Sequence, residues 1–111
     1  MASGEDSGRI VVVGAGFALW QGGRCIAMGR WGDITRMQAF RVSDAADTVR
    51  VVVTLADGAV LELHENAPGF DPFLDRASTV LSTMRPFASW HPAMMLAPAT
   101  TEGVTIYQRK F

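Results

Sequence analysis

The sequence predicts an α+β domain, with a mostly antiparallel sheet of five to six strands and one main helix packed on one face. Two observations lead to this class. Two apolar stretches, residues 49–55 and 60–65, flank a turn at Ala56-Asp57-Gly58, and a helical pattern follows over residues 73–84. With 111 residues, 49% of them apolar, the chain has enough apolar side chains for one core. Residues 1–8 are small and polar and predict a flexible tail, so residues 9–111 form the single expected domain.

The apolar pattern of the hairpin predicts its register. A two-residue loop at Asp57-Gly58 would pair Val53 with Glu62 and scatter polar side chains over both faces. A three-residue loop, with Gly58 in the left-handed conformation, pairs Val53 with Leu61 instead. That register places Thr54, Glu62 and His64 on one face. On the other face, under the helix, it gathers Val51, Val53, Leu55, Leu61 and Leu63.

Capping residues and periodicity predict the helix. Asp71 is a good N-cap and Pro72 suits the first helical position, because its missing N–H has no partner there anyway. Arg85-Pro86 ends the helix. The apolar stripe between these signals consists of Phe73, Leu74, Ala77, Val80, Leu81 and Met84.

The other elements follow from glycines, prolines and alternation. Residues 9–20 predict one strand, bulged or bent at its glycines, and Gly22-Gly23 turns it into a strand over residues 25–28. Residues 31–42 predict a strand kinked near Gly32-Asp33, and residues 43–48 a turn. Residues 90–98 predict one short helical turn, and residues 104–109 a last strand at a sheet edge.

Charge and cysteine content exclude several classes of function. The net charge of −1 argues against a nucleic-acid binder held by phosphate contacts. Residues 9–41 carry a net +4 and residues 42–75 a net −6, a separation that favours oriented docking with a charged partner. The single Cys25 permits no internal disulfide and predicts a buried thiol in a reducing compartment. The apolar stretch at residues 10–20 is too short to cross a bilayer, so we expect a cytoplasmic protein without a membrane partner.

No sequence motif predicts a catalytic, cofactor-binding or metal-binding residue. The stretch at residues 11–18 imitates a dinucleotide-binding fingerprint, but Leu19 stands where the third glycine belongs. His64 and His91 lack the spacing of a metal site. We expect His64 to form a surface pair with Glu62, and His91 to pack beside its neighbouring tryptophan. The tryptophans are expected in the core, namely Trp20, Trp31 and Trp90.

Short landmarks follow one another along the chain. They are Trp31-Gly32-Asp33-Ile34, Ala39-Phe40-Arg41, Glu65-x-x-x-Gly69-Phe70, Trp90, Pro98-Ala99 and Tyr107-x-Arg109. Their order resembles a group of small bacterial proteins of uncharacterised function. The middle of the chain also resembles bacterial pleckstrin-homology-like domains, in which an antiparallel sheet with a W-x-x-I strand is closed by a C-terminal helix, although residues 86–111 depart from that pattern. The resemblance implies a non-catalytic protein of the immunity type, which occupies the surface of a toxin.

The expected function is therefore protein binding without catalysis, as an immunity-type inhibitor of a partner protein. The competing class is a small ligand-binding domain or enzyme using His64 or His91, and a third alternative is a homodimer with a structural role. A deep polar pocket with a histidine and a carboxylate would favour the competing class. The residues expected to contact a partner are Arg36, Arg41, Glu62, His64 and Glu65.

Overall fold

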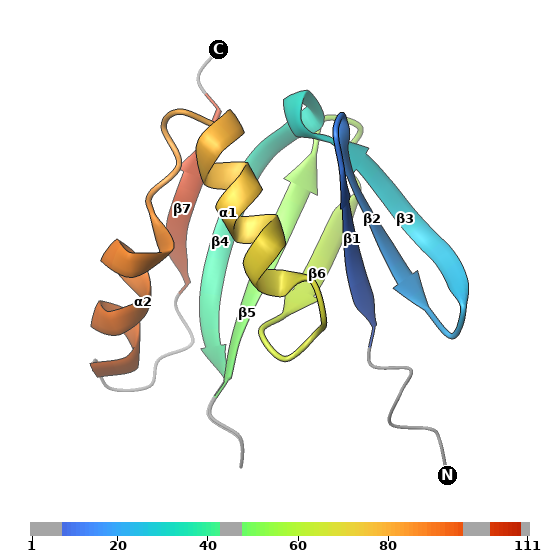
Figure 1. The fold of residues 1–111 in the computed structure, drawn as a ribbon. Helices are drawn as coiled ribbons and strands as arrows, with labels where there is room; N and C mark the ends of the chain where they lie inside the picture. Colours follow the sequence, from blue (N-terminus) through green and yellow to red (C-terminus); the bar gives the residue numbers. More distant parts are fainter. Residues whose placement is uncertain (1–7, 43–47, 97–102, 110–111) are drawn as a thin grey trace, which may run out of the picture.

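The computed structural model describes residues 8–42, 48–96 and 103–109, which form seven strands and two α-helices (Figure 1). The strands form two antiparallel sheets, of three and four strands. The predicted α+β class is confirmed, whereas the single sheet of five to six strands is wrong. The predicted tail, the turn after residue 42 and the Pro98-Ala99 landmark lie outside the described residues, apart from Gly8 and Thr48.

The first sheet contains β1 (Arg9–Val13), β2 (Gly16–Gln21) and β3 (Arg24–Arg30). The prediction of one bent strand over residues 9–20 is wrong, because Gly14-Ala15 form a tight turn and Val13 pairs with Gly16. A Cβ at Gly16 would lie 1.9 Å from the Gly29 carbonyl oxygen, so only glycine can start β2 this close to β3. The predicted turn between β2 and β3 is confirmed, with φ of 61° at Gly22 and 77° at Gly23.

The second sheet contains β4 (Ile34–Val42), β5 (Thr48–Leu55), β6 (Val60–His64) and β7 (Val104–Gln108), in the order β6-β5-β4-β7. A single turn of 3₁₀ helix, Trp31–Asp33, connects the first sheet to β4 and forms the predicted kink. The last strand lies at a sheet edge, as predicted. This 3₁₀ turn, called the 3₁₀ corner below, redirects the chain from the first sheet to the second.

The predicted register of the β5–β6 hairpin is confirmed. Val51 pairs with Leu63 and Val53 with Leu61. The Leu55 N–H donates to the Ala59 carbonyl at 2.8 Å, and Gly58 closes the three-residue loop at a φ of 91°. Burial alternates along β5, as expected for a strand with one face in the core.

The first helix, α1, spans Phe70–Val80, so both predicted ends are wrong. It begins at Gly69, which adopts the left-handed conformation at φ 91° and serves as the N-cap in place of Asp71. It ends at Val80, because Leu81 takes an extended conformation. Leu81 and Met84 are still buried, but they reach the core from the following loop rather than from a helical face.

The second helix, α2, spans Phe87–Leu96, which is longer than the predicted single turn. Pro92 lies inside it. The residues buried by this helix are Trp90 and Met94. Burial of these two large side chains offsets the hydrogen bond that proline removes from the helix, a balance that local sequence cannot show.

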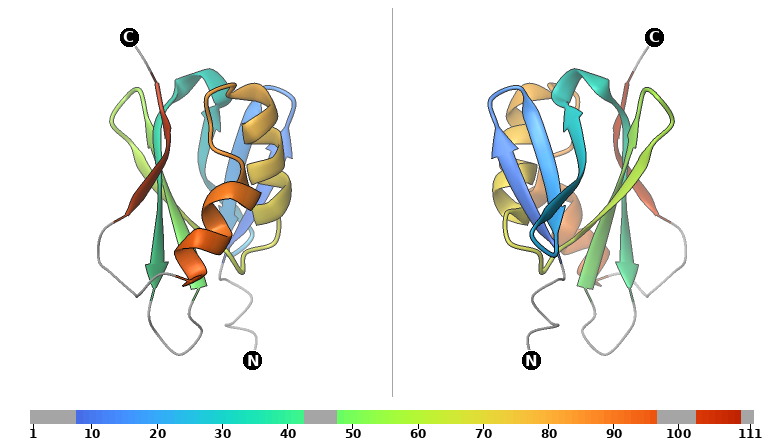
Figure 2. Two further views of the ribbon diagram at one scale, coloured as in Figure 1. Left: turned by 90° about the vertical axis from the view of Figure 1, so that its left-hand side faces the viewer. Right: turned by 90° about the vertical axis from the view of Figure 1, so that its right-hand side faces the viewer.

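Both helices and the first sheet lie on the same side of the second sheet (Figure 2). An aromatic cluster joins the layers: the rings of Phe17 and Phe73 are 5.0 Å apart, and those of Trp31 and Phe73 are 5.5 Å apart. Trp31 and Trp90 are buried as predicted, whereas Trp20 is half-buried. The prediction for Cys25 is wrong, because its thiol is exposed. The opposite face of the second sheet has no described helix or strand over it.

Candidate protein-binding surface

The outer face of the second sheet forms a grid of side chains from β4, β5 and β6. The inner neighbours Met37, Val51 and Leu63 are buried, so the alternate residues point away from the core. Strand register arranges these outer residues in three rows across the sheet. The rows are Arg36, Thr54 and Val60; then Gln38, Val52 and Glu62; then Phe40, Arg50 and His64.

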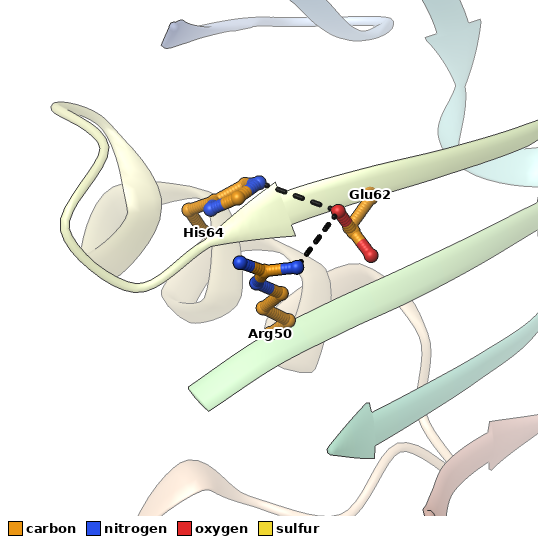
Figure 3. A network of polar contacts seen from close by, with 3 residues as sticks. All are labelled: Arg50, Glu62 and His64. Atoms are coloured by element: carbon orange, nitrogen blue, oxygen red, sulfur yellow. Dashed lines mark hydrogen bonds and ion pairs between the residues drawn. The ribbon is translucent and has the colours of Figure 1, made fainter. Parts of the chain in front are cut away.

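A network of polar contacts lies at the β6 edge of this face (Figure 3). Glu62 Oε1 is 3.5 Å from Arg50 Nη1 and 3.4 Å from His64 Nε2, which confirms the predicted pair of Glu62 and His64. The three side chains are between 35% and 49% exposed, so solvent weakens each attraction. The network therefore adds little stability, but it links three hydrogen-bonding groups on the outer face of the sheet.

An open hollow of about 310 Å³ lies beside this edge, between β6 and the inner side of β2 and β3. Apolar side chains form most of its wall, and Glu62 and His64 line its rim. The remaining lining residues are Gly8, Leu19, Gln21, Ile26, Ala27, Val60, Leu61 and Ala67. The histidine and carboxylate are thus half-exposed at an open hollow rather than enclosed by protein.

The two other candidate residues lie on the core side, against α2. Arg41 Nη1 donates to the Met94 carbonyl at 3.5 Å. Glu65 Oε1 accepts the Val49 N–H, and its Oε2 lies near His91 Nε2, both at 3.0 Å. The His91 ring stacks on Phe87 at 4.3 Å, so this histidine packs as predicted. Arg41 and Glu65 therefore connect α2 to the second sheet, while Arg36, Glu62 and His64 share the outer face.

Replacing Glu65 with alanine is expected to destabilise the protein by about 1–3 kcal/mol, because the Val49 N–H and His91 would both lose their acceptor. Glu65→Gln keeps an acceptor oxygen, so its loss of unfolding free energy should be less than half that of Glu65→Ala. Urea unfolding followed by tryptophan fluorescence measures both changes. Equal losses in the two variants would contradict an anchoring role for the carboxylate oxygens.

Sequence reasoning missed Arg50, Phe40 and Val52 as members of the outer face. Extending the predicted hairpin register by one pair would have found Arg50 opposite His64. The contact between Glu65 and His91 gave no sequence signal, because 26 residues separate the two side chains. It depends on where α2 docks.

Other site types find no support in the part of the chain that the structure describes. Within it, no group of three or more histidine, cysteine or acidic side chains could hold a metal ion. Neither described helix has the length and apolar character needed to cross a membrane. No protein-family model, curated protein or solved structure matches the chain. The resemblance to small bacterial proteins and to pleckstrin-homology-like domains therefore stays a prediction.

Proposed function

We propose that this protein is a non-catalytic protein-binding module whose partner docks on the outer face of the second sheet. The observation that carries the proposal is the composition of that face, over which no described helix or strand lies. Arg36, Glu62 and His64 flank an apolar strip formed by Phe40, Val52 and Val60. Val60 is 61% exposed, so most of this apolar side chain remains in contact with water.

A flat face with both charge signs around apolar side chains suits a protein better than a small ligand. Protein interfaces combine an apolar centre with a polar rim that hydrogen-bonds to the partner. The contacts among Arg50, Glu62 and His64 also restrict these side chains before binding. Less side-chain entropy is then lost when the complex forms.

The specific form that we propose is an immunity-type inhibitor, which neutralises a toxin by covering its surface. Such a protein needs a rigid face and no chemistry of its own. The second sheet supplies the rigidity, because β5 is paired on both sides and its inner face is buried. The opposed charges of residues 9–41 and 42–75 would orient the partner during encounter.

A small-ligand site or enzyme that uses His64 is the second candidate. One observation favours it: His64 and Glu62 both line the hollow of about 310 Å³. His91 is less suited to such a role, because Glu65 and Phe87 already contact its ring. Fragment screening by saturation-transfer NMR tests this candidate. A fragment whose binding disappears in His64→Ala would replace the protein-binding proposal.

Charge exchange on the outer face is expected to weaken binding of the partner about 10- to 100-fold, the effect of losing central charged contacts. The test compares Arg36→Glu/Glu62→Arg with the wild type, using calorimetry against the product of the adjacent gene. The matched control is Asp75→Arg/Arg76→Glu, which exchanges two exposed charges on α1 at the same net charge. Equal weakening by both double variants, or no binding by the wild type, would contradict the proposal.

A further inference from the structure

We infer that the outer face of the first sheet is a second docking surface, suited to an acidic protein with an apolar centre in its contact area. This surface is separate from the outer face of the second sheet. Burial of Ile10 and Phe17 determines which residues of the first sheet point outward. Register then brings together Arg9 and Trp20, Val11 with Ala18 and Met28, and Val13 with Arg30.

Apolar side chains on this face remain in contact with water. Met28 is 71% exposed and Val13 is 50% exposed. These two are a third of the large apolar side chains that are exposed in the described residues. Contiguous exposed apolar surface of this kind marks an interaction site more often than scattered single residues do.

All charged side chains of β1, β2 and β3 are positive. Arg9 and Arg30 stand at opposite corners of the sheet, and Arg24 lies at the hairpin between β2 and β3. All three are exposed, and the described residues offer none of them a salt bridge. No acidic residue occurs between residues 8 and 32, and the first is Asp33, beyond the end of β3. A partner surface with carboxylates around an apolar centre would complement both features.

A hollow at one end of this face provides room for an anchoring side chain. Its volume is about 340 Å³, and Val13, Met28 and Arg30 lie in its wall. The rest of the wall consists of Ala15, Gly16, Phe17, Gly29 and Asp33. An apolar side chain of the partner could enter beside Val13 and Met28 while a neighbouring carboxylate binds Arg30. Centrally buried anchors of this type carry most of the affinity in protein interfaces.

The same features fit an acidic protein better than a nucleic acid or a membrane. Nucleic acids require many phosphate contacts and stacked aromatic rings, whereas this face is mainly aliphatic and its one tryptophan is half-buried. Peripheral membrane binding relies on side chains that protrude from a helix or a loop into the lipid. Here they spread over three paired strands (Figure 1), with Arg9 and Arg30 at opposite corners of the sheet by its register.

The test uses NMR of the full ¹⁵N-labelled chain titrated with a synthetic peptide in which glutamates flank a leucine cluster. We expect chemical-shift changes over β1, β2 and β3, and none with the counterpart that carries lysines. Arg9→Glu/Arg30→Glu should weaken binding at least about tenfold. Arg76→Glu/Arg85→Glu makes the same change in net charge at exposed positions outside this sheet and should leave affinity within about twofold.

Parallel titrations separate the other partner classes. They use phosphatidylserine–phosphatidylcholine vesicles and a short DNA duplex at the same ionic strength. Chemical-shift changes in the first sheet with vesicles or DNA, but not with the acidic peptide, would overturn the inference. Equal affinity of Arg9→Glu/Arg30→Glu and Arg76→Glu/Arg85→Glu for the peptide would also overturn it. Val13→Thr/Met28→Thr tests the apolar contacts of this face separately. This variant keeps the arginines and should still bind the peptide more weakly than the wild type.

Discussion

Gly69→Ala is expected to destabilise the protein by at least about 3 kcal/mol and to prevent stable folding of the domain. Gly69 adopts φ 91°, a conformation that disfavours side chains. A Cβ at this position would also lie 1.8 Å from the Ile10 carbonyl oxygen, in the backbone of β1. That backbone cannot move without losing the 2.8 Å hydrogen bond from the Ile10 N–H to the Pro68 carbonyl.

Gly58→Ala is the matched control. Gly58 has the same φ of 91°, but a Cβ there would meet no atom within 4 Å. Its substitution should therefore cost only about 1 kcal/mol, the penalty of the left-handed conformation itself. Urea unfolding by circular dichroism measures both. If Gly69→Ala lowers the free energy of unfolding no more than Gly58→Ala does, the close approach of Gly69 to the Ile10 carbonyl does not constrain the fold.

Phe73→Ala is expected to destabilise the protein by about 3–5 kcal/mol, since it removes a large buried ring and leaves a cavity. Phe73 is fully buried and contacts both Phe17 and Trp31. Through these rings α1 holds the first sheet and the 3₁₀ corner together. We therefore expect Phe73→Ala to increase local unfolding in both sheets. Faster amide hydrogen exchange in β2 and β4 would measure this effect.

Val80→Ala serves as its control on the same helix. Val80 is 45% exposed, and alanine has the higher helix propensity, so the free energy of unfolding should change by less than about 0.5 kcal/mol. Denaturant unfolding of the two variants side by side gives both values. A large loss for Val80→Ala would mean that the helix buries the face predicted from the sequence, rather than the face seen in the structure.

Placing both helices on one side has a consequence for function. The core occupies the space between the sheets, so the outer face of each sheet remains free of described elements (Figure 2). One free face mixes charges around Phe40, Val52 and Val60, and the other combines arginines with Val13 and Met28. A module with two such faces could hold two partners together, and the two sets of charge variants address the faces independently.

Local signals predicted the β5–β6 hairpin best. Alternation along residues 49–55 and 60–65 selects one register, because a shift of one residue would turn every apolar side chain toward water. The face opposite the core, with Thr54, Glu62 and His64, followed directly from that register. It accounts for two of the five candidate residues, Glu62 and His64. Arg36 shares this face because β4 pairs with β5, which the hairpin register did not predict.

The ends of α1 and the contacts of α2 could not be predicted in this way. Asp71 and Pro72 are good starting residues for a helix, yet Gly69 begins it because the chain must pass close to the Ile10 backbone. Periodicity extended the helix to Met84, although Leu81 and Met84 are buried from a loop. Arg41 and Glu65 looked like surface charges until the docking of α2 supplied Met94 and His91 as partners.

The sequence by itself determined the α+β class, the β5–β6 register, the turn at Gly22-Gly23 and the edge position of the last strand. Each of these depends on residues close together in the chain, whose conformational preferences and alternation act locally. Only the tertiary structure decided that the strands divide into two sheets, that α2 anchors on Glu65, and that Met28 and Val13 stay exposed. Those outcomes depend on contacts between distant segments, where burial and backbone clearance outweigh local preference.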